Sequence, residues 1–214
     1  MSVGEKMLDL LFPPKCPFCQ KILDNPRAPL CRSCHPKLPW LEGKAGERKI
    51  DFTDGCFSPL AYRDLVPEAI QRYKFSRVKA LGRPFAALMA RCLDSQRLEG
   101  VDLICWAPLS KKRRRERGFD QAELLAREVG RLLSIPAAPV LLKTRNTAPQ
   151  SGLEDEYARR ANARGVALSG KRVVLVDDVV TSGSTLSECA ALLHQGGASQ
   201  VFCLTLAQAR KDRV

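Results

Sequence analysis

Residues 173–185 place a buried strand, two acidic residues, a hydroxyl-rich loop and the start of a helix in direct succession. Four apolar residues without alternation open the stretch, which is typical of a strand buried on both faces of a parallel sheet. Asp177 and Asp178 follow, and after the loop Thr185 or Ser184 begins a predicted capping box. Backbone N–H groups and hydroxyls at a helix N-terminus favour a phosphate, whereas two carboxylates suit a polyol or Mg²⁺. The order therefore predicts a sugar-phosphate site, the alternative being an ordinary strand-to-helix turn whose aspartates only cap and solvate.

This stretch resembles the phosphoribosyl-pyrophosphate (PRPP) motif of type I phosphoribosyltransferases and matches it without a gap. The resemblance implies an α/β fold with a parallel sheet flanked by helices, and Mg²⁺ as a cofactor when PRPP is bound. It implies that Asp177 and Asp178 form the catalytic pair and hold the ribose hydroxyls. It also implies that the loop wraps the 5′-phosphate with Thr181, Ser182, Gly183, Ser184 and Thr185.

Size and charge narrow the class of protein and of partner. The 214 residues suffice for one α/β domain with a small appendage. The net charge of +12 and the pI of about 9.5 favour nucleic acid or a heavily phosphorylated small molecule, unless the charge serves only solubility. No apolar run approaches the length of a membrane span, and residues 7–12 make a poor signal peptide and a better short helix. We therefore expect a cytoplasmic protein without membrane insertion.

Two Cys-x-x-Cys knuckles lie near the N-terminus, separated by 11 residues. Four thiolates at this spacing can close a tetrahedral structural Zn²⁺ site, and so small a segment needs such a staple to fold. Because the chain shows no export signal, its nine cysteines favour metal binding and reduced thiols over disulfides. The string Cys31–His35 also matches a c-type haem attachment pattern, and a redox pair is the third interpretation. We expect a zinc site formed by Cys16, Cys19, Cys31 and Cys34, with His35 at the surface and core thiols at Cys56, Cys92, Cys105, Cys189 and Cys203.

A basic run follows a second buried strand. Residues 101–109 read as that strand, and it ends in a Pro-bearing loop, where open α/β sheets place ligands. Six of the next seven residues after Ser110 are basic, which indicates either a solvated surface or a clamp for pyrophosphate or a nucleic-acid backbone. Beside a proposed phosphate site the clamp is favoured, because six cations repel one another unless an anion relieves them. The clamp residues are Lys111, Lys112, Arg113, Arg114, Arg115 and Arg117.

Periodicity predicts two further helices. Apolar residues at helical spacing predict one over 81–93, and Asp120 with Glu123 forms a capping box before the second. Arg72 and Lys74 precede these helices, and we interpret them as solvent-exposed surface residues rather than as residues that contact a ligand.

Strands are expected at 140–143 and 201–207. Between the first of these and the strand of the PRPP motif lies the polar stretch 144–164, which shows no clear strand. Such a segment is either a lid that moves over a site or a disordered loop.

Taken together, the chain resembles the ComF family (also called GntX-like), the competence- and DNA-utilisation-associated phosphoribosyltransferase homologues of bacteria. Besides the cysteine pairs and the PRPP motif, the resemblance rests on Tyr73–Phe75, Pro108–Leu109, Arg117–Gln121, Thr147–Gln150 with Leu153, and Arg159–Asn162. It implies that loop 144–162 closes over the site and that the pyrophosphate loop consists of Ala107, Pro108, Leu109 and Ser110. We expect a zinc-binding module at 1–45 and a phosphoribosyltransferase-like domain at 55–214.

The family resemblance implies a role in DNA uptake and processing during natural competence, and we expect the pocket, the basic run and the zinc module to bind single-stranded DNA. A third interpretation is that the zinc module and the pocket form a docking platform for a competence helicase. PRPP or another ribose phosphate would occupy the pocket. Basic charge supplies sequence-independent affinity for DNA, although only 6% of the residues are aromatic and able to stack on bases. The alternative is an active enzyme that transfers ribose 5-phosphate from PRPP to an unidentified nitrogen acceptor.

The chain departs from the family pattern in three respects. It has Trp106–Ala107 where the family often has Pro-Val, and Asp120 where the family often has Asn. It also has a single four-cysteine set where many relatives carry two zinc ribbons.

Overall fold

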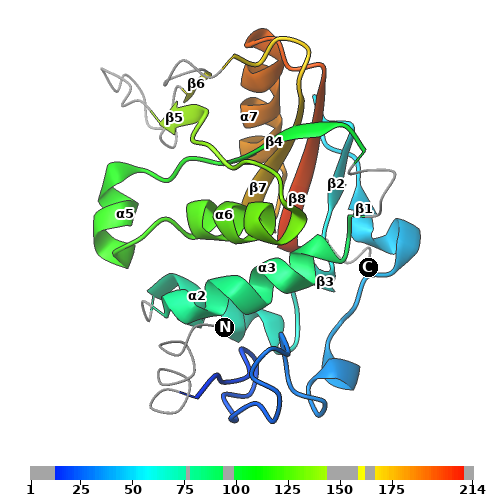
Figure 1. Cartoon of the computed structure of the whole chain (residues 1–214), viewed down its shortest axis with the longest axis vertical. Coiled ribbons are helices and arrows are strands. Elements are labelled where there is room, and N and C mark those ends of the chain that lie inside the picture. The colour runs from blue at the N-terminus through cyan, green and yellow to red at the C-terminus, as the bar shows by residue number, and fades with distance from the viewer. Residues whose placement is uncertain (1–12, 76–77, 94–98, 144–158, 162–166, 210–214) are drawn as a thin grey trace.

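The computed structural model describes residues 13–75, 78–93, 99–143, 159–161 and 167–209, so the helix expected at 7–12 lies outside the described residues. In the described part, one sheet has the strand order β1-β2-β8-β7-β4, and β3 also pairs with β8 (Figure 1). Neighbouring strands are parallel except β1 and β2, so the expected parallel sheet is confirmed, with an antiparallel strand added at one edge. The strands are β1 Glu47–Arg48, β2 Gly55–Phe57, β3 Leu60–Ala61, β4 Val101–Trp106, β7 Arg172–Val180 and β8 Gln200–Gln208.

Both faces of the central strand β7 are covered. Val174 and Val176 belong to a core shared with one group of helices, whereas Val173 and Leu175 pack with a helix on the opposite face. A strand that buries both rows of side chains needs apolar residues throughout, which explains the absence of alternation in the sequence. The first face carries α2 Val66–Phe75, α3 Gly82–Ala90 and α6 Gln121–Leu133, and the second carries α7 Ser184–Gln195.

Two side chains cap the helices that follow β4. Ser110 Oγ accepts the N–H of Arg113 at 3.3 Å and begins α5 Lys111–Arg117. Asp120 accepts the N–H of Glu123 at 3.2 Å and begins α6, as the capping box predicted. In a full capping box the Glu123 carboxylate would accept the N–H of the N-cap residue. Here it forms ion pairs with the guanidinium groups of Arg114 in α5 and Arg127 in α6. Gly118, at φ 78°, provides the left-handed residue that ends α5 and lets the chain turn into α6.

The structure corrects the sequence prediction at the acidic pair and at the following helix. Asp177 and Asp178 lie within β7, which continues to Val180, rather than after the strand. The residue before α7 is Gly183, so neither Thr185 nor Ser184 is the N-cap. Gly183 has a φ of 92°, and a Cβ at this position would lie 3.3 Å from Ile50. Glycine therefore meets both a conformational and a steric requirement here.

A second correction concerns the polar stretch 144–164. Its residues 159–161 form β6 Arg159–Ala161, which pairs antiparallel with β5 Leu141–Lys143 in a separate small sheet. Three polar or small residues carry no strand pattern of their own, so pairing with β5 determines this strand. The lid expected at 144–162 otherwise lies outside the described residues.

The cysteine-bearing segment packs beneath α2 and α3, as the dark blue trace in Figure 1 shows. Phe18 contacts Phe85 of α3, with ring centroids 6.2 Å apart. Arg72 of α2 donates to the carbonyl oxygens of Pro17 and Phe18 at 2.7 and 3.0 Å. The prediction that Arg72 is only a solvent-exposed surface residue is therefore wrong. Three short 3₁₀ helices complete the described elements: η1 His35–Lys37, η2 Gly43–Gly46 and η3 Lys79–Leu81. None of the helices that the structure describes has both the length and the hydropathy of a membrane span.

Candidate functional site

The two carboxylates of the acidic pair have different partners. Asp178 is 8% exposed, and its Oδ1 lies 2.8 Å from the Nζ of Lys74, at the end of α2. Asp177 is half-buried, and its Oδ1 accepts the backbone N–H of Asp178 at 2.8 Å. The pair therefore does not point into bulk solvent, and one of its members is neutralised by a cation from another element.

Burial raises the pKa of Asp177 to about 7, and the negative charge of Asp178 acts in the same direction. The N–H that Asp178 donates and the Lys74 ammonium oppose this rise. Asp177 therefore changes its protonation state near neutral pH. When ionised it can accept a hydrogen bond from a hydroxyl group, and when protonated it can donate one to a hydroxyl oxygen.

Lys74 belongs to the site, although the sequence interpretation placed it in solvent. Its neighbour Tyr73 is buried and donates its hydroxyl to the carbonyl of Gln121 at 3.0 Å. Gln121 in turn donates to the carbonyl of Lys74 at 3.5 Å. These contacts fix the end of α2 against the start of α6 and aim the ammonium at Asp178. The Tyr73–Phe75 string of the ComF resemblance was the only sequence signal for this role.

The hydroxyl-rich loop lies directly after β7, at the N-terminus of α7. Thr181, Ser182 and Ser184 are exposed, and Gly183 between them is buried. The hydroxyls of Ser182 and Ser184 lie 3.0 Å apart, and Thr185 is in the first turn of the helix. Exposed hydroxyls, a glycine turn and a twelve-residue helix are the features that favour an anion at this end.

The predicted pyrophosphate loop leaves the sheet beside the acidic pair. Ala107 donates its N–H to the carbonyl of Val176 at 3.0 Å, immediately before Asp177 in the adjacent parallel strand. Leu109 donates its N–H to Asp120 Oδ2 at 3.3 Å, so Asp120 holds this loop as well as the start of α6. Burial raises the pKa of Asp120, and the two N–H groups that it accepts act against that rise. Both loops thus emerge at the carboxyl ends of neighbouring parallel strands, where open α/β sheets bind ligands.

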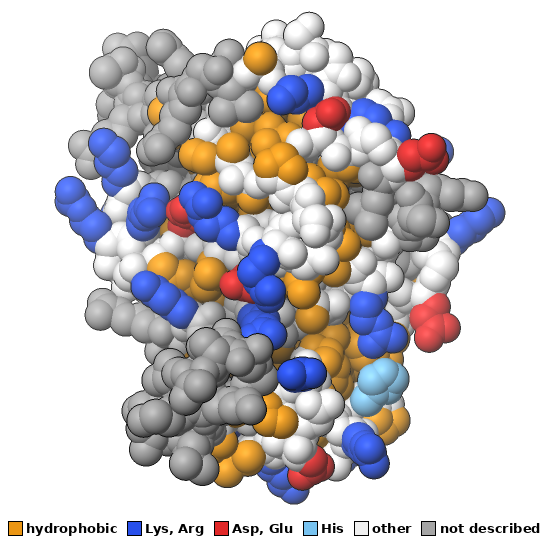
Figure 2. Space-filling view, viewed as in Figure 1, with side chains coloured by type: hydrophobic (Ala, Val, Ile, Leu, Met, Phe, Trp, Pro, Cys, Tyr) orange, Lys and Arg blue, Asp and Glu red, His pale blue; other side chains and the backbone are white. Residues whose placement is uncertain are grey.

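The basic run forms α5, and its side chains divide into two groups. Arg114 pairs with Glu123 at 3.3 Å, and Arg117 donates to Gln121 at 2.9 Å and lies over the ring of Phe75. The other four, Lys111, Lys112, Arg113 and Arg115, are exposed and have no partner among the described residues. Figure 2 shows Lys and Arg side chains gathered on this side of the molecule, over α5.

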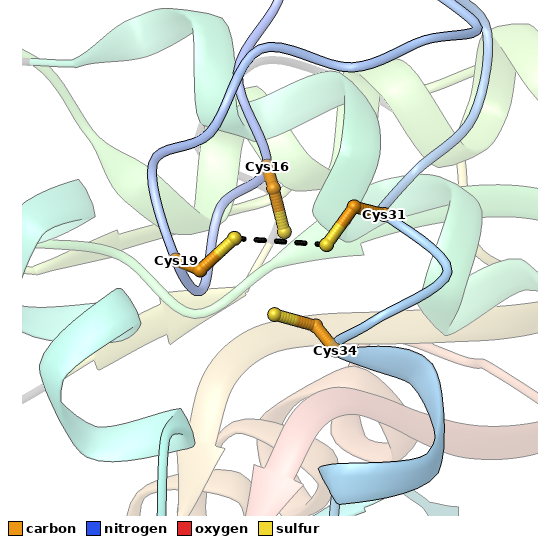
Figure 3. Close-up of side chains that lie close together, drawn as sticks. All are labelled: Cys16, Cys19, Cys31 and Cys34. Atoms are coloured by element: carbon orange, nitrogen blue, oxygen red, sulfur yellow. Dashed lines mark hydrogen bonds between the residues drawn. The ribbon is translucent and has the colours of Figure 1, made fainter.

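The four cysteines of the knuckles converge, as Figure 3 shows. Their sulfur atoms all lie within 4.8 Å of one another, and Cys19 Sγ is 3.6 Å from Cys31 Sγ. A tetrahedral zinc ion with Zn–S bonds of about 2.3 Å requires sulfur atoms about 3.8 Å apart. Burial and the neighbouring thiols raise the pKa of Cys34 above its usual range, so four thiolates need a cation among them. The donor set and its spacing therefore fit a structural Zn²⁺ ion.

The remaining cysteines agree largely with the sequence interpretation. Cys56, Cys105, Cys189 and Cys203 are fully buried in the core under α7, whereas Cys92 is half-buried. His35 is exposed, with its ring 5.0 Å from that of Trp40.

Two hollows of the described surface lie away from the acidic pair. One, of about 370 Å³, is lined by residues that include Cys31, Arg32 and His35. The other, of about 420 Å³, is lined by the last turns of α6 and the residues that follow it. Neither is lined by Asp177 or Asp178.

Comparison with known proteins gives relatives that match most of the chain. Competence protein F of Haemophilus influenzae is 31% identical, over 91% of this chain and 90% of its own length. DNA utilization protein YhgH of Escherichia coli K12 is 32% identical, over 88% of this chain and 82% of its own. Competence protein ComFC of Bacillus subtilis is 29% identical, over 70% of this chain and 62% of its own.

Two domain families match separate parts of the chain. A double zinc ribbon domain matches residues 7–48, and a phosphoribosyl transferase domain matches residues 116–214. Among solved structures, adenine phosphoribosyltransferase from Thermoanaerobacter pseudethanolicus aligns with 77% of this chain and 96% of its own, at 16% identity and a TM-score of 0.42. Identity of this extent with competence protein F and with YhgH shows that the chain belongs to the ComF family.

Proposed function

We propose that the carboxyl ends of β7 and β4 bind a ribose 5-phosphate group, as PRPP or as another ribose phosphate. The observation that carries this proposal is the succession of Asp177, Asp178 and an exposed hydroxyl loop at the start of α7, beside the loop that follows β4. The acidic pair accepts hydrogen bonds from the ribose hydroxyls, and Thr181–Thr185 bind the phosphate. The match to the phosphoribosyl transferase domain supports this assignment.

In the cell, we propose that the protein handles incoming single-stranded DNA in the cytoplasm during natural competence. The names of its relatives and the four unpartnered cations of α5 support a role with DNA, and a competence helicase is the expected protein partner. Cations that face solvent without carboxylate partners can neutralise phosphates along a backbone, whatever its sequence.

An active phosphoribosyltransferase is the second candidate, favoured by the acidic pair. In this reaction a nitrogen lone pair attacks C1′ of PRPP, the bond from C1′ to oxygen breaks, and pyrophosphate leaves with the bonding electrons. Asp177 and Asp178 would hold the ring while positive charge develops on it, and the exposed cations of α5 would attract the departing anion. Two carboxylates are too few to hold Mg²⁺ by themselves, so the ion would arrive with PRPP and neutralise its pyrophosphate.

Titration calorimetry with ribose 5-phosphate, and with PRPP plus Mg²⁺, tests the pocket. We expect binding by the wild type and a loss of at least tenfold in affinity for Asp177→Asn/Asp178→Asn, since two carboxyl groups that bind the ribose hydroxyls are lost. Asp24→Asn/Asp64→Asn removes the same charge from exposed positions and should bind as the wild type does. Equal affinity of the wild type and the acidic-pair variant would exclude this pocket.

Pyrophosphate release separates the two candidates. An enzyme releases pyrophosphate from PRPP when offered nucleobases, and the Asp177→Asn/Asp178→Asn variant does not. A binding protein releases none at saturating PRPP, although it binds the ligand.

A further inference from the structure

We propose that Arg48 is the positioning residue of the phosphate loop: its guanidinium holds two loop peptides so that their N–H groups face the phosphate. The inference deepens the proposed function and rests on it. Arg48 lies in β1, at the end of the segment that matches the zinc ribbon, far in sequence from the loop. No motif pointed to it, because its partners are 133 and 134 residues away.

The contacts of Arg48 are specific to backbone oxygen atoms. Its Nη1 donates to the carbonyl of Thr181 at 2.5 Å and to that of Ala209 at 3.2 Å. Its Nη2 donates to the carbonyl of Ser182 at 3.2 Å. The guanidinium is thus a planar fork spread over consecutive peptides of the loop, a geometry that the single ammonium group of a lysine does not reproduce.

The orientation of the N–H groups follows from the geometry of the peptide. In a trans peptide the C=O of one residue and the N–H of the next point in opposite directions. Because Arg48 holds the carbonyls of Thr181 and Ser182, the N–H groups of Ser182 and Gly183 point away from it. Among the described residues, neither of these N–H groups has an acceptor. Both are therefore available on the side of the loop opposite Arg48.

Other contacts reinforce this arrangement. The Ile50 side chain, two residues after Arg48, lies 3.3–3.5 Å from the position that a Cβ of Gly183 would occupy, so the same segment approaches the loop at two points. The two N–H groups directly precede the N-terminus of α7, and consecutive backbone donors at a helix start are typical of anion sites. The charge of Arg48 lies behind the loop and adds attraction for the same anion.

Titration calorimetry with ribose 5-phosphate, combined with amide NMR during titration with inorganic phosphate, tests the proposal on the full chain. We expect Arg48→Met to lower affinity for ribose 5-phosphate about tenfold, and Arg48→Lys to restore only part of that loss, since lysine keeps the charge but not the fork. In the wild type, phosphate should shift the amide signals of Ser182 and Gly183, and in Arg48→Met these shifts should shrink. Lys49→Met removes an exposed cation one residue away and should leave both readouts unchanged.

The outcomes separate this inference from the function on which it rests. A wild type that binds no ribose 5-phosphate overturns the proposed pocket itself. If the wild type binds and Arg48→Met binds equally well, Arg48 does not position the loop. Full recovery in Arg48→Lys would overturn the proposal too, because charge alone would then account for the effect. If Arg48→Met does not fold, the comparison of Arg48→Lys with the wild type decides in the same way.

Discussion

At the scale of single residues, Asp177 and Asp178 are adjacent in sequence but differ in electrostatic environment. Asp178 faces Lys74, whereas burial raises the pKa of Asp177 to about 7 from its ordinary value of 3.8. The folded protein therefore keeps a proton that the unfolded chain has released, and the free energy of unfolding falls as pH rises from about 4 to about 7.

The first prediction is that Asp177→Asn abolishes this fall in the free energy of unfolding with rising pH. Urea unfolding should give the variant a free energy of unfolding about 1–2 kcal/mol above that of the wild type at pH 8, after allowance for the partial exposure of the carboxyl. At pH 4 the difference should nearly vanish, because Asp177 is then protonated in the folded wild type. Asp24→Asn, at an exposed position, should show no such dependence. A difference that is the same at both pH values would contradict the role given to burial.

The second prediction concerns Lys74, whose side chain is 20% exposed while that of Asp178 is 11% exposed. Lys74→Met leaves the Asp178 carboxylate buried without its cation, and we expect a loss of about 2–3 kcal/mol in the free energy of unfolding. Lys74→Met/Asp178→Asn should recover part of that loss, so that a double-mutant cycle gives a coupling of about 1–2 kcal/mol. Lys44→Met, at an exposed site, should change stability by less than about 0.5 kcal/mol. Additive effects of Lys74→Met and Asp178→Asn would show that the pair contributes nothing.

At the scale of elements, helix α5 separates structural cations from available ones. The third prediction is that Lys112→Gln/Arg113→Gln/Arg115→Gln weakens binding of single-stranded DNA and leaves the fold intact, because these exposed residues have no partner among the described residues. Three lost phosphate contacts should reduce the slope of log K against log salt concentration by about 2. Fluorescence anisotropy with a labelled oligonucleotide at several salt concentrations measures this slope.

The control for α5 is Lys44→Gln/Lys49→Gln/Arg63→Gln, which removes the same charge from exposed positions elsewhere. If both triple variants lose affinity equally, net charge and not α5 governs binding. Arg114 and Arg117 are left intact, because their contacts to α2 and α6 would confuse loss of binding with loss of structure.

Comparing these elements with the sequence shows which features of the fold and the site could be predicted, and why others could not. Strand β7, the cap of α6 and the cysteine cluster follow from local patterns, since burial on both faces, a capping side chain and ligand spacing each leave a mark within a few residues. Lys74 and Arg48 act on residues over 100 positions away in the chain, and no local pattern records such pairs. The start of α7 was misplaced because Gly183, with a left-handed φ of 92° and no side-chain cap, occupies the position at which the hydroxyl residues of the sequence pattern were expected.

At the scale of the whole molecule, the cysteine module and the α/β domain share one core. Phe18, Leu23 and Leu38 of the module belong to the same apolar cluster as Tyr73 and Phe85. Arg72 joins α2 to the first knuckle through the carbonyls within its Cys-x-x-Cys turn. Disorder in the knuckles therefore exposes apolar surface of α2 and α3, and α2 is the helix that carries Lys74 to the acidic pair.

The last prediction is that zinc stabilises the whole chain rather than the module alone. Cys16→Ser, or removal of the metal by a chelator, should lower the thermal midpoint of the entire helix and sheet signal by on the order of 10 °C, in one transition. Cys92→Ser changes a half-buried thiol outside the cluster and should retain one zinc ion per chain by elemental analysis, with a much smaller shift. Affinity for ribose 5-phosphate should fall along with the metal content, since α2 and β1 lose their support. An unchanged main transition in a chain shown to have lost its zinc would mean that the module is only tethered to the domain, despite the shared core.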